Sequence, residues 1–132
     1  MLREPLTAAR KRSPWRSAAP RSILEVGCGE GLAAIAIART YPNAAIDGYD
    51  LDEASISVAR EKAADAGVAD RVRFEVRDAA DPGIVGNYDL VVAIEMLHDV
   101  PDPVAVLRTM KKLAGADGAV LVVDERTDRK SV

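Results

Sequence analysis

The residues best suited to chemistry form a glycine-rich turn, Gly27 to Gly31, between two apolar segments. The segment before the turn, 23–26, is typical of a buried strand, and the segment after it, 32–39, contains helix formers with one apolar face. Such a turn holds a ligand against bare backbone, and the free N–H groups at the start of a helix favour a negatively charged group. We therefore predict a small ligand that carries a carboxylate or a phosphate.

Acidic residues stand at the ends of four predicted strands, where a core strand has no need of them: Glu25, Asp50, Asp78 and Glu95. We expect these four side chains to converge on one crevice. Asp50 follows Gly31 by 19 residues, a spacing typical of an acid that accepts hydrogen bonds from ribose hydroxyls. The alternative is that Asp50 caps the next helix, although Asp52 is better placed for that role.

Three side chains, one of them among these acids, could react with a ligand. His98, the single histidine, and Glu95 are the candidate catalytic residues, because either could act as a general base at the crevice. The structural alternative for His98 is that it fixes the loop before Pro101 and Pro103. Cys28 has no partner base nearby in sequence, so we predict a small side chain that fills a tight turn rather than a nucleophile.

Apolar runs of strand length alternate with longer amphipathic stretches, which is typical of parallel strands joined by crossover helices. Strands are predicted at 22–26, 45–49, 71–76, 88–94 and 119–123, and helices at 31–39, 53–66 and from 101 to about 113. Right-handed crossovers then give an α/β, doubly wound (Rossmann-like) parallel sheet in the order 3-2-1-4-5, with strand three at an edge. The ligand is expected beyond the carboxyl ends of strands one and four.

The composition, with 132 residues, 48% apolar and 30% charged, is ordinary for a single globular domain. Residues 1–20 contain five Lys and Arg against one Glu, so we predict a basic, flexible N-terminal arm before a core at 21–132. An anionic partner for this arm is the alternative. One cysteine excludes an internal disulfide and favours the cytoplasm. No stretch reaches the roughly 18 apolar residues of a membrane span, so we expect neither membrane insertion nor export.

From residue 22 to about residue 125 the sequence resembles the class I S-adenosylmethionine-dependent methyltransferases, in particular their small-molecule branch. The similar motifs come in order at 24–31, 47–52, 76–79, 88–92 and 95–103. An NAD-dependent oxidoreductase is disfavoured, because Leu32 occupies the place of the third glycine in a dinucleotide fingerprint. Nucleic acid is also disfavoured as a partner. Many nucleic-acid amino-methyltransferases carry an Asn-Pro-Pro-Tyr type of motif after the fourth strand, whereas this sequence has Ile-Glu-Met-Leu at 94–97.

The resemblance implies S-adenosylmethionine as the cofactor, with S-adenosylhomocysteine as its product. By this resemblance the loop of Gly27, Cys28, Gly29 and Gly31 packs against the methionine half of the cofactor, and Glu25 reaches its amino group.

For the adenosine half, the resemblance implies that Asp50 binds the ribose hydroxyls and that Leu51 packs on one face of the adenine. Asp78 then accepts from the exocyclic amine, while the Ala79 N–H donates to the ring, and Glu95 is a further cofactor-binding candidate. Carboxylates suit these donors, because they have only acceptor sites. The alternative for Asp78 is a turn residue without a ligand. No metal site is predicted.

The implied function is methyl transfer to an unidentified small-molecule acceptor. The alternative is a catalytically inactive S-adenosylmethionine-binding or interaction module, or a fragment of a longer methyltransferase. The sequence departs from the family at its C-terminal side, where the usual antiparallel strands are lacking. We therefore expect the strand at 119–123 to be an unprotected edge, through which the chain could form a homo-oligomer.

Overall fold

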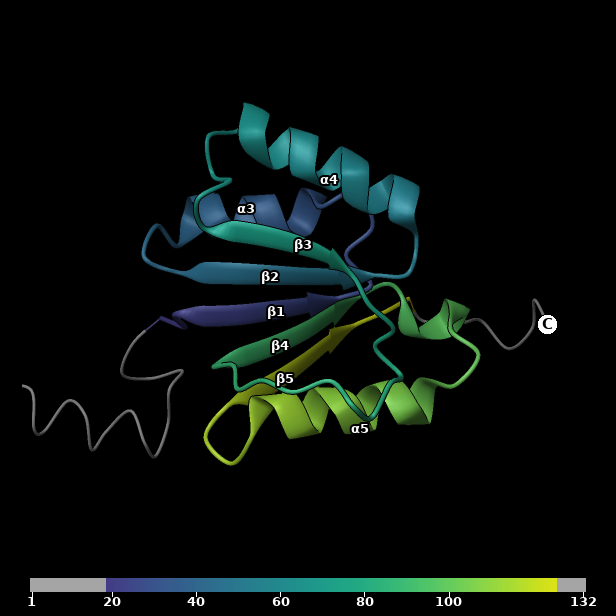
Figure 1. Cartoon of the computed structure of the whole chain (residues 1–132). Helices are drawn as coiled ribbons and strands as arrows, with labels where there is room; N and C mark the ends of the chain where they lie inside the picture. The colour runs from purple at the N-terminus through teal and green to yellow at the C-terminus, as the bar shows by residue number, and fades with distance from the viewer. Residues whose placement is uncertain (1–18, 126–132) are drawn as a thin grey trace, which may run out of the picture.

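The computed structural model describes residues 19–125, so nearly all of the predicted basic arm lies outside the described residues. Five parallel strands form one sheet in the order β3-β2-β1-β4-β5, which confirms the predicted order (Figure 1). The strands are β1 (Ser22–Val26), β2 (Ala45–Asp50), β3 (Val72–Val76), β4 (Leu90–Ile94) and β5 (Ala119–Val123). The carboxyl ends of all five strands lie at the same end of the sheet, as the arrowheads in Figure 1 show.

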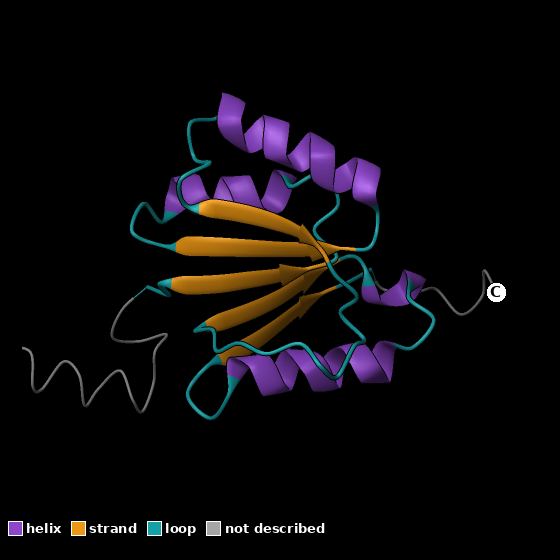
Figure 2. Cartoon of the chain, in the orientation of Figure 1, coloured by secondary structure: helices purple, strands orange, loops and turns teal. Residues whose placement is uncertain are grey.

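Helices cover both faces of the sheet, as Figure 2 shows. Helices α3 (Leu32–Thr40) and α4 (Glu53–Asp65) lie on one face, and α5 (Pro103–Ala114) lies on the other. A short 3-10 helix, η1 (Leu97–Asp99), follows β4 and was not predicted. Among residues 19–125, none of the helices combines the length and the apolar composition needed to cross a membrane.

The N-terminus of α4 lies where it was predicted, whereas that of α3 differs by one residue. Helix α4 begins after Asp52, as predicted, because the Asp52 carboxylate accepts a hydrogen bond from the Ser55 N–H at 3.3 Å. Helix α3 begins at Leu32, one residue later than predicted. Gly31 is its N-cap and has a φ of +86°, a left-handed conformation that cannot continue a right-handed helix.

Most other boundaries shift by one or two residues. Helix α5 begins at Pro103 rather than at residue 101, because the Asp102 carboxylate caps it by accepting from the Ala105 N–H at 3.1 Å. Strand β4 begins at Leu90 rather than at residue 88, since the Tyr88 N–H donates to the carbonyl of Leu113 on α5. Strands β2 and β3 run through residues 45–50 and 72–76, and helix α4 ends at residue 65.

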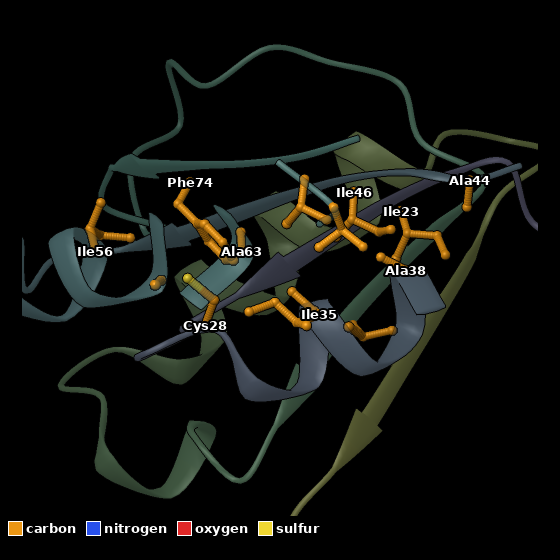
Figure 3. Close-up of a cluster of buried hydrophobic side chains, with 14 of the residues drawn as sticks. Ile23, Cys28, Ile35, Ala38, Ala44, Ile46, Ile56, Ala63 and Phe74 are labelled. Atoms are coloured by element: carbon orange, nitrogen blue, oxygen red, sulfur yellow. The ribbon is translucent and has the colours of Figure 1, made fainter. Parts of the chain in front are cut away.

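The core consists of two apolar layers, one on each side of the sheet. Ile23 and Phe74 belong to the layer under α3 and α4, shown in Figure 3, whereas Leu24 and Leu113 belong to the layer under α5. Neighbouring β1 side chains thus alternate between the layers, as strand geometry requires. Four of the five β1 residues are buried, which is typical of a central parallel strand.

Strand β5 lies at one edge of the sheet and is far less covered than β1. Its residues from Val120 to Val123 are each 40–45% exposed, although all four are apolar. Strand β3 lies at the opposite edge, as predicted, and buries Val72 and Phe74 under α4 while Arg73 faces solvent. In the part of the chain that the structure describes, β5 thus exposes a continuous apolar edge and β3 does not.

Candidate functional site

A cavity of about 450 Å³ lies at the carboxyl ends of the strands, within the size range of small-molecule sites. The loops that follow β1, β2, β3 and β4 form its walls, together with the start of α5. Six of the predicted site residues line it: Gly27, Asp50, Leu51, Asp78, Ala79 and Glu95. The topology thus brings together residues that lie far apart in the sequence.

The glycine-rich turn forms part of the cavity floor through backbone rather than side chains. Gly27 has a φ of +68°, and a Cβ there would come within 3.0 Å of the Met96 side chain. Gly29 has a φ of +54°, and a Cβ there would have no heavy atom within 4 Å. The space next to Gly29 is therefore open, and the backbone conformation at both positions favours glycine.

Asp50 connects this turn to the start of α4. One carboxylate oxygen accepts from the Gly29 N–H at 2.7 Å, and the other accepts from the Asp52 N–H at 2.9 Å. The helix cap itself is Asp52. Because a carboxylate offers about four acceptor positions, Asp50 retains lone pairs for a ligand in the cavity that it lines.

Glu25 is the exception to the predicted convergence of acids. It lies within β1, is 3% exposed and does not line the cavity. The pKa of its carboxyl is raised to about 8: burial is the largest cause, the Ala34 N–H of α3 opposes it, and the Asp50 carboxylate adds to it. Its Oε1 has no hydrogen-bond partner among residues 19–125. A buried unpaired carboxyl oxygen is costly, and a cationic ligand group would satisfy it.

The opposite wall of the cavity is built from the ends of β2 and β3. Leu51 is 66% exposed although it is apolar, and it faces the cavity beside the buried Ala79. Asp78 accepts a hydrogen bond from the Ala80 N–H at 2.9 Å, which is the turn contact considered as its alternative role. Asp78 also lines the cavity, so the turn contact and a ligand contact are compatible.

The end of β4 has an unusual backbone. Glu95 has a φ of +52° and is the one non-glycine residue with positive φ in the part of the chain that the structure describes. Its N–H donates to the carbonyl of Val123 on β5 at 2.5 Å. Non-glycine residues with this conformation cost free energy and concentrate at functional sites.

His98 lies on η1 next to the cavity, but it is not one of its lining residues. Its ring Nδ1 lies 2.5 Å from a carboxylate oxygen of Asp124, the residue that follows β5. This hydrogen bond raises the pKa of the imidazole above its ordinary value, and the carboxylates of Asp124, Asp99 and Glu125 add to the effect. Within residues 19–125, no group of three or more His, Cys, Asp or Glu is arranged to hold a metal ion.

Cys28 contributes backbone to the turn and its side chain to the core. Its N–H donates to the carbonyl of Tyr49 at 3.0 Å, whereas its thiol packs in the layer under α3 and α4, as Figure 3 shows. Burial, together with the carboxylates of Glu25 and Asp50, raises the pKa of the thiol to about 12. A thiol in this state is not a nucleophile at neutral pH.

Several cavity residues were missed by the sequence analysis. Arg77 and Tyr49 both line the cavity, and the Arg77 guanidinium lies 5.6 Å from the centre of the Tyr49 ring. Met96 and Asp99 complete the wall after β4. Asp124 was missed too, although it directly follows a predicted strand and thus carries the same sequence signal as Asp50.

The comparisons with known proteins agree with this architecture. A family model described as "Methyltransferase domain" matches residues 19–131. A ubiquinone biosynthesis O-methyltransferase of Pseudomonas paraeruginosa is 35% identical over 104 residues, which are 79% of this chain and 44% of that protein. This chain therefore spans less than half the length of that curated relative.

Two solved structures share the fold. An O-methyltransferase from neocarzinostatin biosynthesis, in complex with S-adenosylmethionine and 2-hydroxy-5-methyl naphthoic acid, has a TM-score of 0.70 and 29% identity over 76% of this chain and 31% of its own. An O-methyltransferase from a polyketide synthase of Brevibacillus brevis, in complex with S-adenosyl-L-homocysteine, has a TM-score of 0.75 over 90% of this chain and 40% of its own. The latter is 20% identical and supports the fold alone. This chain belongs to the class I S-adenosylmethionine-dependent methyltransferases.

Proposed function

We propose that this chain is the cofactor-binding part of an S-adenosylmethionine-dependent O-methyltransferase with a small-molecule acceptor. The observation that carries the proposal is the cavity at the carboxyl ends of the strands, with Asp50 at the end of β2 and bare glycine backbone at the end of β1. Family membership supports the cofactor. The hydroxyl acceptor is supported by two of the relatives, the ubiquinone biosynthesis O-methyltransferase and the O-methyltransferase from neocarzinostatin biosynthesis.

The residues present fit this cofactor. Beside Gly29 the backbone is open, and the buried Glu25 Oε1 lacks the partner that a ligand ammonium group would supply. Leu51 offers the cavity an exposed apolar side chain of the kind that packs on an aromatic ring. A ribose would find free acceptor positions on Asp50.

The cofactor supplies a methyl group bound to a positively charged sulfur. The tasks left to the protein are alignment and the exclusion of water, because an in-line displacement needs little covalent help. In our proposal Asp50 and the glycine turn hold the cofactor, and Glu95 and Met96 form the wall nearest the acceptor. A hydroxyl acceptor also requires a base within hydrogen-bond reach, and His98 and Glu95 are the candidates.

The first experiment titrates the whole chain with S-adenosylhomocysteine and with NAD in a calorimeter. We expect S-adenosylhomocysteine to bind and NAD not to bind. Asp50→Ala should weaken binding by about 1 to 3 kcal/mol, the typical cost of leaving buried donors unpaired. Asp70→Ala is the matched control, because Asp70 is exposed just before β3, at the other end of the sheet.

The outcomes of the titration test the role of Asp50 and the validity of the assay separately. Unchanged affinity in Asp50→Ala would remove Asp50 from the site, and loss of binding in Asp70→Ala would show that the assay reports folding instead. Methylation of a hydroxyl probe such as catechol then tests catalysis. Binding without turnover would favour the inactive binding module over the enzyme. The cytoplasmic location and the lack of a nucleic-acid partner stay predictions.

We also propose that the β5 edge pairs with a second copy of the chain. The apolar residues from Val120 to Val123 are 40–45% exposed on both faces of an edge strand, and an edge strand presents unpaired backbone groups. Sedimentation over a range of concentrations should therefore detect a dimer that Leu121→Lys abolishes. Val104→Lys is the control, since Val104 is 55% exposed on α5. A wild-type monomer at every concentration would contradict the pairing.

A further inference from the structure

The connection between β3 and β4, residues 77–89, contains no helix along its length, as Figure 2 shows. Parallel strands are usually joined by a crossover helix, and a loop of this length without secondary structure is uncommon. Its first residues, from Arg77 to Ala80, line the cavity, and Ile84 in its middle is buried in the layer under α5. The contacts that fix this connection therefore also fix one wall of the cavity.

Tyr88 fastens the end of the connection to β2 and to α5. Its hydroxyl donates to Oδ2 of Asp47 on β2 at 2.6 Å, and its backbone N–H donates to the carbonyl of Leu113 on α5 at 2.8 Å. A phenol has a single O–H, so its oxygen is the acceptor towards the Tyr49 hydroxyl, which lies 3.4 Å away. Burial, together with the hydrogen bonds to Asp47 and Tyr49, raises the pKa of Tyr88 above its ordinary value, so the phenol stays a donor at neutral pH.

Tyr49 also fastens the start of the connection. The Arg77 guanidinium lies 5.6 Å from the centre of the Tyr49 ring, within the range of a cation–π contact. The Tyr49 side chain is buried and lines the cavity, and its carbonyl accepts from the Cys28 N–H of the glycine-rich turn. One residue of β2 thus contacts both ends of the connection and the turn on the other side of the cavity.

We propose that Tyr49 and Tyr88 are positioning residues, which hold the two ends of the connection against β2 and thereby place Asp78 for the 6-amino group of the cofactor's adenine. This inference rests on the proposed function and on the adenine contact that the family resemblance implies for Asp78. Tyr88 is not one of the residues that line the cavity, so its effect on the ligand passes through the connection.

A purely structural role is the competing explanation, in which the two tyrosines only add to the stability of the fold. The second partner of Asp47 is Arg73, whose side chain is 74% exposed, so this ion pair contributes little to holding β2 and the connection together. A structural role predicts that loss of a hydroxyl lowers the free energy of unfolding and leaves the cavity wall of the folded protein unchanged. A positioning role predicts a change in the wall itself.

The turn at Asp78 offers two local probes of that wall. Oδ1 of Asp78 accepts from the Ala80 N–H at 2.9 Å, and the Asp78 carbonyl accepts from the Asp81 N–H at 3.0 Å. Local opening of this turn exposes both amides to exchange with solvent. Hydrogen exchange of the Ala80 and Asp81 amides, followed by NMR, therefore reports how firmly the connection is held.

The chain has three tyrosines, which allows the same substitution at each. Tyr88→Phe should speed exchange at the two amides by about fivefold, because it removes the donor to Asp47 and the acceptor for Tyr49 together. Tyr49→Phe removes one of these bonds and should have a smaller effect. Tyr41→Phe is the matched control, since Tyr41 follows α3 and lines no part of the cavity. Wild-type exchange in Tyr88→Phe would overturn the proposal.

The second measurement compares S-adenosylhomocysteine with S-inosylhomocysteine, in which an oxygen replaces the 6-amino group. The wild type should prefer the adenine compound by about tenfold or more, because a carboxylate and a carbonyl oxygen are both acceptors. Asp78→Asn should abolish the preference, since its amide can donate to the oxygen. Tyr88→Phe should reduce the preference several-fold, and Tyr41→Phe should keep it. A variant that is only less stable loses affinity for both compounds equally and keeps their ratio.

The proposal and the proposed function fail in distinguishable ways. If neither compound binds the wild type, the proposed function fails, whereas hydrogen exchange still decides whether Tyr88 holds the wall. If S-adenosylhomocysteine binds and Tyr88→Phe keeps the wild-type preference, the cofactor stands and the positioning role is wrong. Equal binding of the two compounds by the wild type would also overturn the proposal, because Asp78 would then not recognise the amino group.

Discussion

Strands β1 and β5 have the same length and the same direction, but they meet their surroundings in opposite ways. β1 buries four of five residues, including the acid Glu25. β5 leaves four apolar residues 40–45% exposed and is followed by the exposed Asp124. β1 has a strand on each side and a helix layer over each face, whereas β5 has one neighbouring strand among residues 19–125. The sheet is thus enclosed at β1, which leads into the glycine-rich turn, and open at β5.

The difference indicates where this chain derives its stability and where it is free to vary. A residue enclosed on all sides contributes its full apolar area to folding, whereas an edge residue contributes only part of it. The buried Glu25 carboxyl lowers stability, because its Oε1 has no hydrogen-bond partner among residues 19–125. The Asp124 side chain is 22% exposed and is paired with His98, so its cost is smaller.

The largest predicted effect compares the same substitution in the two strands. Leu24→Ala in β1 should reduce the free energy of unfolding by about 3 to 5 kcal/mol, because Leu24 is fully buried. Leu121→Ala in β5 should cost about 1 kcal/mol, since Leu121 is 44% exposed. Urea unfolding of dilute protein measures both. Equal losses would show that β5 is covered in solution, and the contrast between the strands would disappear.

The next prediction concerns the acid in β1 and its pH dependence. The pKa of Glu25 is about 8 in the folded state and near 4.5 when unfolded, so the folded state binds more protons between these values. The free energy of unfolding should therefore fall as pH rises from about 4.5 to 8. Glu25→Gln should remove this decline in the free energy of unfolding, which amounts to a difference on the order of 2 to 4 kcal/mol between pH 4.5 and pH 8.

Urea unfolding at several pH values measures this slope. Glu61→Gln, an exposed change on α4, is the control and should keep the wild-type dependence. A wild-type slope in Glu25→Gln would mean that Glu25 is not protonated in the folded protein. In that case a different group would have to account for any decline in stability.

The smallest predicted effect on stability comes from two glycine substitutions, and it tests whether the cofactor binds beside Gly29. Gly29 and Gly67 both have positive φ, at +54° and +75°, and neither would place a Cβ within 4 Å of another atom. Alanine at either position should cost about 1 to 2 kcal/mol of stability, the price of a left-handed backbone. Gly29→Ala alone should also weaken S-adenosylhomocysteine binding, by tenfold or more, in a calorimetric titration. Equal affinities in the two variants would place the ligand away from Gly29.

Most elements could be predicted because they depend on local pattern, and the strand order followed from the right-handed crossovers between parallel strands. The buried run 23–26, the Asp52 cap and the glycine turn are each readable within a few residues. The 3-10 helix η1 was not predicted, because it has no buried residue and no side-chain cap to mark it. The start of β4 was predicted too early, because the Tyr88 N–H bonds to a residue 25 positions away on α5.

The sequence by itself determined the family motifs, the alternation of strands and helices, and the identity of the acids that end the strands. Only the tertiary structure decided which of them share a cavity: Asp50, Asp78 and Glu95 line it, whereas Glu25 is enclosed in β1. Only the structure brought Asp124 to His98, because that contact depends on the register between β4 and β5. Register is set by packing between strands, and no local stretch of sequence encodes it.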